Sequence, residues 1–110
     1  MNRQHRELAG GRWKELSFLN QMANIGSEIE RALNWKKKDR SDYCKSSFER
    51  ALELLDITIE NSAGFPRIKE LARAREVLVD YFFETNYFAS SDESWRKYFF
   101  PFMLAARKNY

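Results

Sequence analysis

Acidic side chains recur at helical spacing in the middle of the chain, and they have the clearest capacity for chemistry. Glu53 and Asp56 form a Glu-x-x-Asp pair, and carboxylates of this kind hold Mg²⁺ when oxygens converge from neighbouring helices. A matching second pair is missing, because the nearest acidic run, "EVLVD", has one residue too many. A solvated acidic face is therefore favoured over a magnesium site. Four carboxylates share that face: Glu49, Glu53, Asp56 and Glu60.

The other residues that could catalyse a reaction or bind a metal are isolated. The sequence has one histidine, His5, and one cysteine, Cys44. Zinc sites and nucleophilic triads both need several such side chains to converge. Cys44 also falls on an apolar helix face, where an inert buried thiol is the usual case. We therefore expect a protein that is not an enzyme and has no metal or cofactor.

The composition indicates a soluble protein of the cytoplasm. A single cysteine cannot form an internal disulfide, which suits a reducing compartment. The first residues lack the apolar stretch of a signal peptide, and no apolar run approaches the roughly 20 residues of a membrane span. The net charge of +3 is mildly basic, well short of a dedicated nucleic-acid binder.

A basic cluster nevertheless stands out in the segment "RALNWKKKDR". A tryptophan beside several cations could stack a base while the cations contact phosphates, so nucleic-acid association is one hypothesis. Cations near the carboxyl end of a helix also stabilise its dipole, which is a sufficient structural reason for them. The candidate nucleic-acid contacts are Arg31, Trp35, Lys36, Lys37, Lys38 and Arg40.

Hydrophobic periodicity predicts an all-α protein with a single domain of 110 residues. Four helices are expected, at about 11–38, 41–60, 66–84 and from 91 to near the C-terminus, whereas 1–10 are expected to fray. The short connections favour an up-down antiparallel four-helix bundle.

Individual residues predict details of this bundle. Gly26 interrupts an apolar stripe, which suggests that another helix approaches its backbone closely. Ser41 is expected to cap the second helix, and Ser90 with Glu93 to form a capping box before the fourth.

Arg75 falls inside the apolar arc of the third expected helix. A buried guanidinium needs a carboxylate partner. The acidic face of the second helix supplies two candidates, so we expect an ion pair of Arg75 with Glu49 or Glu53 that fixes the register of the two helices.

Several apolar residues fall outside the core-facing stripes. Large apolar side chains on the outer faces of three helices are typical of a surface for self-association or for a partner protein. Pro101 is expected to bend the last helix near two of them. We therefore expect a homo-oligomer or a protein that docks another protein. The candidate interface residues are Trp13, Phe18, Trp35, Leu54, Ile57, Phe100 and Leu104.

Most of the chain resembles a family of short helical proteins of bacteria and archaea that has no established activity. Three segments carry the likeness: "ANIGSEIERALNWKKKDR", "SFERALELLDITIE" and "REVLVDYFFETNYFASSDESWRKYFFPFMLAARK". The resemblance transfers no catalytic residue.

In general shape the chain is also similar to two other helical groups, and one short motif is similar to a third. The four-helix bundles encoded in intervening sequences of ribosomal RNA genes imply ring assembly and a basic surface. The helical partners of minimal nucleotidyltransferases imply a protein partner, although their Arg-x-x-x-x-His motif is missing here. Helical nucleotide pyrophosphohydrolases share the "ELLD" half of a magnesium motif, which leaves a magnesium-dependent nucleotide hydrolase as a further alternative.

Overall fold

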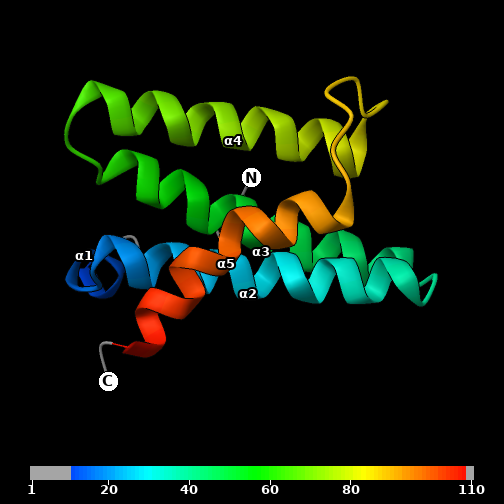
Figure 1. Ribbon diagram of the computed structural model, residues 1–110, viewed down its shortest axis with the longest axis horizontal. Coiled ribbons are helices and arrows are strands. Elements are labelled where there is room, and N and C mark those ends of the chain that lie inside the picture. The colour runs from blue at the N-terminus through cyan, green and yellow to red at the C-terminus, as the bar shows by residue number, and fades with distance from the viewer. Residues whose placement is uncertain (1–10, 109–110) are drawn as a thin grey trace.

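The computed structural model describes residues 11–108, which form four long α-helices and one short one (Figure 1). Neighbouring helices in the chain run antiparallel, so the predicted all-α helical bundle is confirmed. In Figure 1, α2, α3 and α4 lie one above another, and α5 crosses α3 and α2 obliquely in front. The helices are α1 (Trp13–Glu15), α2 (Phe18–Lys37), α3 (Ser41–Glu60), α4 (Phe65–Phe83) and α5 (Asp92–Lys108).

The core lies mainly where α2 meets α3 and α5. Most of the apolar stripe of α2 is fully buried, and Phe48 and Leu55 of α3 face it. Trp95 and Phe99 of α5 close the core from the other side of α2. The close approach predicted at Gly26 is confirmed, because the side chain of Phe99 lies directly against it. Within the described part of the chain, no helix combines the length and the apolarity of a membrane span.

The first expected helix is divided in two at Ser17. Ser17 has an extended backbone, and its hydroxyl oxygen accepts the N–H of Asn20, which caps the start of α2. The short α1 is held in place by two side-chain hydrogen bonds. Gln21 donates from its side-chain amide to the Trp13 carbonyl at 2.9 Å, and the Trp13 indole donates to the Thr58 hydroxyl at 2.9 Å.

Two of the predicted helix caps differ from the structure. Ser41 is already the first residue of α3, and Arg40 precedes it without a side-chain cap. The capping box before α5 is shifted by one residue: Ser91 and Ser94 each accept the backbone N–H of the other. Serine replaces the expected acidic partner because its hydroxyl accepts the N–H equally well over this short span.

Three of the seven candidate interface residues prove to be core residues, and their predicted outward position is wrong. Trp13, Leu54 and Ile57 are all buried. The reason is that α3 packs on two sides, against α2 and against α4, while α1 covers its carboxyl end. A helix covered on two sides buries a wider arc than the single stripe assumed from the sequence.

Candidate functional site

An apolar groove lies between α4 and α5, on the open side of the bundle. α4 packs against α3, and α5 packs against α2, which leaves α4 and α5 apart. The groove has a volume of about 490 Å³, and its lining residues are Pro66, Lys69, Glu70, Arg73, Ala74, Val77, Trp95 and Tyr98. A hollow of this size between helices is a common place for ligands and for partner segments.

Trp95 gives the groove an unusual feature. Its side chain is 5% exposed, and its indole Nε1 has no hydrogen-bond partner among the described residues. The ring packs edge-on against Tyr98, with centroids 5.5 Å apart. Buried indole N–H groups usually find an acceptor, because an unpaired donor away from water destabilises the fold. Trp95 is therefore closely packed, but its indole N–H is left without an acceptor among the described residues.

Tyr98 lines the groove from the same helix. Burial is the largest cause that raises the pKa of Tyr98, to about 12, and the nearby Glu70 carboxylate adds to it. The phenol therefore stays protonated at neutral pH. Its hydroxyl lies 3.5 Å from Glu70 Oε1, which is the outer limit of a hydrogen bond.

Two cations border the groove on the α4 side. Lys69 and Arg73 form no ion pair with any residue of the described range 11–108. The guanidinium of Arg73 lies 5.7 Å from the ring centroid of Phe88, in the loop between α4 and α5. The Glu70 carboxylate also lines the groove, so the two cations leave its rim with a net positive charge.

A buried carboxylate orders the loop that follows α4. Asp80 is 4% exposed, and its two oxygens accept the backbone N–H groups of Tyr87 at 2.9 Å and Phe88 at 3.0 Å. Asn86 takes a positive φ of 59° to make this turn. Tyr87 is nevertheless 82% exposed. The loop thus presents an aromatic side chain to solvent from a backbone that is fixed in place.

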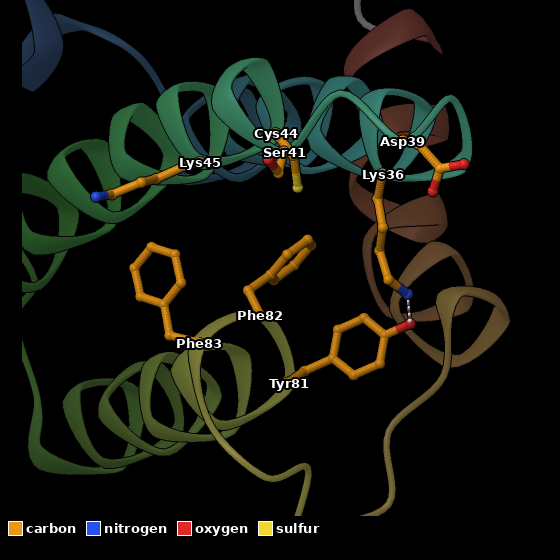
Figure 2. A pocket seen from close by; sticks show the side chains of 8 residues that line it. All are labelled: Lys36, Asp39, Ser41, Cys44, Lys45, Tyr81, Phe82 and Phe83. Atoms are coloured by element: carbon orange, nitrogen blue, oxygen red, sulfur yellow. Dashed lines mark hydrogen bonds between the residues drawn. The ribbon is translucent and has the colours of Figure 1, made fainter.

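The basic cluster is divided among different contacts. Lys36 donates to the Tyr81 hydroxyl at 2.7 Å and to Asp92 Oδ1 at 3.0 Å, and the Tyr81 hydroxyl also contacts Asp92 (Figure 2 shows the first bond). These three residues, which we call the clasp, join α2, α4 and α5. Burial acts to lower the pKa of Lys36, but the hydrogen bonds to Tyr81 and Asp92 outweigh it and raise that pKa.

The other members of the cluster do not form one continuous basic face. Arg31 pairs with Glu28 on its own helix. The rings of Trp35 and Tyr43 lie 4.8 Å apart, with the Lys38 ammonium 5.4 Å from the Trp35 ring. The guanidinium of Arg40 lies over Tyr43 and 3.8 Å from Asp42, while Lys37 forms no ion pair within residues 11–108.

The remaining candidate interface residues have different environments. Phe100 and Leu104 are 60% and 40% exposed, so their predicted outward position is confirmed. Phe18 and Trp35 are only partly buried, and the Phe18 ring meets Phe102 edge-on. Of the seven candidate interface residues, only Phe100 and Leu104 are exposed, and both lie on α5.

The structure pairs Arg75 with Asp56, at 2.6 Å, where we expected Glu49 or Glu53. Asp56 lies one helical turn beyond Glu53. Arg75 reaches Asp56 because α4 is set further along α3 than the sequence indicated. Both side chains of the pair are 39% exposed, so the guanidinium is not buried as expected. Within residues 11–108, no three acidic, histidine or cysteine side chains gather as a metal site would require.

Sequence reasoning missed the α4–α5 groove. Trp95 of α5 is a core residue and Tyr98 packs against the core, yet both also line the groove. A hollow depends on the distance between helices, which a periodicity does not contain. The pair of cations one turn apart, Lys69 and Arg73, was the signal that could have indicated an open edge there.

Comparison with known proteins gives no family for this chain. No family model, no curated protein and no solved structure matches it.

Proposed function

We propose that this protein is a non-enzymatic interaction protein whose α4–α5 groove binds an amphipathic, acidic helix of a partner protein. The observation that carries the proposal is the open apolar groove next to a buried indole N–H that has no acceptor among the described residues. An amphipathic helix can fill an open apolar groove of a helical bundle, as in helix-in-groove recognition.

The apolar part of the groove supports a helical partner. Ala74 and Val77 lie one turn apart on α4, and Trp95 and Tyr98 lie one turn apart on α5. Two such rows define a channel into which the apolar stripe of a third helix packs. The exposed ring of Phe88, near Arg73 at the rim, offers a further aromatic contact of the kind that dominates binding energy at interfaces.

The charge of the rim supports an acidic partner. Lys69 and Arg73 line the groove and form no ion pair within residues 11–108, and together they outweigh the one carboxylate there, that of Glu70. Carboxylates on the flank of the incoming helix would pair with both cations and steer it into register.

A second copy of the chain is the less suitable partner. Its acidic helix is α3, but the apolar stripe of that helix, including Phe48 and Leu55, is buried in its own core. A second copy could offer this helix only by unfolding. Self-association through Phe100 and Leu104, on the exposed face of α5, is the alternative that the experiment must separate.

The test uses a synthetic amphipathic peptide of about four helical turns with leucines on one face and glutamates beside them. We expect it to shift the indole N–H signal of Trp95 in a ¹H–¹⁵N spectrum, because the peptide covers that ring. The double substitution Lys69→Glu with Arg73→Glu should abolish the shift. A peptide with lysines in place of glutamates should bind far more weakly to the unaltered protein.

Phe100→Ser is the matched control, since it removes an exposed aromatic residue outside the groove and should leave peptide binding unchanged. Equal binding of the acidic and basic peptides would contradict the proposal. So would shifts gathered around Phe100 and Leu104, or a dimer in light scattering that Phe100→Ser dissociates. Either of the last two results would assign the interface to the outer face of α5.

Nucleic-acid association is a second candidate, favoured by the Trp35–Tyr43 ring pair with Lys38 beside it and Lys37 next to Lys38 in the sequence. Lys36 is unsuitable for testing it, because its substitution would also break the clasp. The informative variant is Lys37→Glu with Lys38→Glu. Binding of single-stranded RNA that weakens steeply with salt and is lost in this variant would support the idea. Absence of binding at low salt would remove it.

A further inference from the structure

We propose that the cleft between α3 and the last turn of α4 is a binding site for a small aromatic carboxylate. The cleft has a volume of about 430 Å³, within the roughly 300–1,000 Å³ of small-molecule sites. It uses a different part of α4 from the α4–α5 groove, so the inference does not rest on the proposed function.

Aromatic rings fixed from behind form one wall of the cleft. In Figure 2, Phe82 and Phe83 rise from α4 toward α3. Phe82 stacks on the buried ring of Phe48 with centroids 4.3 Å apart, and Phe83 meets the same ring edge-on at 4.9 Å. Phe83 is still an exposed residue. The wall is therefore rigid and open to solvent, which suits a flat aromatic ring.

The opposite wall comes from the first turns of α3. Figure 2 shows the Cys44 thiol directed into the cleft, with Ser41 beside it. Burial raises the pKa of the Cys44 thiol, so the thiol is neutral at physiological pH. A ring bound between Cys44 and Phe82 would contact polarisable sulfur on one side and an aromatic ring on the other.

Charge at the two ends of the cleft orients the ligand. Lys36 closes one end and Lys45 borders the other, as Figure 2 shows. The Lys36 ammonium is already neutralised by Asp92, and Asp39 stands at the same end. Lys45 forms no ion pair with the described residues. A carboxylate therefore binds at Lys45, and its aromatic body extends toward Tyr81.

The probe is 2-naphthoate, compared with the neutral 2-naphthalenemethanol of the same shape. We expect naphthoate to shift the backbone amide signals of Cys44, Lys45 and Phe83 and to bind more tightly than the alcohol. Lys45→Gln should weaken naphthoate binding about tenfold and leave the alcohol unchanged, because only the charged pair is lost. Bound naphthoate should also slow the alkylation of Cys44 by iodoacetamide.

Lys97→Gln is the matched control, since it makes the same change of side chain at an exposed position of α5, outside the cleft and outside the α4–α5 groove. It should leave naphthoate binding unchanged. The proposal is overturned if both probes bind equally, if the shifts gather in the α4–α5 groove, or if saturating naphthoate fails to protect Cys44. A peptide that binds the groove while naphthoate binds nowhere would refute this inference alone.

Discussion

Phe99 of α5 lies so close to Gly26 of α2 that a Cβ added at Gly26 would stand 3.0 Å from the Phe99 Cβ. A Cβ is tied to its own backbone, so the contact can relax only if α5 moves. This single position sets how closely the two helices approach.

We expect Gly26→Ala to destabilise the protein. Alanine gains about 1 kcal/mol of helix propensity over glycine, but overpacking a tight contact costs about 1–3 kcal/mol, so the net loss is on the order of 1 kcal/mol. Urea unfolding measures the difference. Ser27→Ala, on the exposed neighbour, is the control and should change the free energy of unfolding by a few tenths of a kcal/mol. A Gly26→Ala protein more stable than the parent would show that α5 can shift.

Thr58→Val should destabilise the anchoring of α1 without changing the volume of the side chain. The substitution removes the acceptor of the Trp13 indole N–H in a site where both residues are buried. An unpaired buried donor costs about 1–3 kcal/mol. The measurement is the free energy of unfolding, with Thr85→Val at an exposed position as the control. A loss no larger than that of the control would mean that the indole finds water instead.

Asp80→Asn should loosen the loop between α4 and α5. The carboxylate accepts two backbone N–H groups, whereas an amide can accept at only one of its two positions. Hydrogen bonds to charged groups contribute about 1.5–3 kcal/mol, and we expect a loss of that order. Hydrogen exchange should show faster exchange of the Tyr87 and Phe88 amides. Glu84→Gln, nearby and exposed, should leave both rates unchanged.

The helices could be predicted from the sequence because the hydrophobic periodicity agrees with the positions of glycine and proline. The apolar stripe of α3, Gly64 just before α4 and Pro66 in the first turn of α4 place both elements closely. Gly26 even indicated a contact between helices. A glycine inside an apolar stripe lowers helix propensity, and it is tolerated where a neighbouring helix occupies the space that a Cβ would fill. The break at Ser17 was missed, since no glycine or proline marks it.

The surfaces could not be predicted, because they depend on how far apart the helices lie. Leu54 and Ile57 belong to the core only because a second helix covers α3. Trp95 belongs to a groove only because α4 and α5 stand apart. The partner of Lys36 was equally hidden, since Asp92 follows it by 56 positions in the sequence.

The clasp predicts how stability depends on pH. Burial acts to raise the pKa of Asp92, but hydrogen bonds from Tyr81 and Lys36 outweigh it and hold that pKa below its ordinary 3.8. The carboxylate thus contributes stability above pH 3.8 that is lost as pH falls through the lowered value. The pKa of Lys36 is raised above 10.5, so its contribution is present below pH 10.5 and is lost as pH rises through the folded value.

We therefore expect the urea midpoint to be level near neutral pH and to fall on both sides. Asp92→Asn should flatten the acid side, while Lys37→Met, which removes a neighbouring lysine outside the clasp, should not. Tyr98, with its pKa raised to about 12, adds to the alkaline side between pH 10 and 12, so Tyr98→Phe should flatten only that side. An acid side that keeps its slope in Asp92→Asn would show that other carboxylates determine it, and that the clasp contributes little to folding.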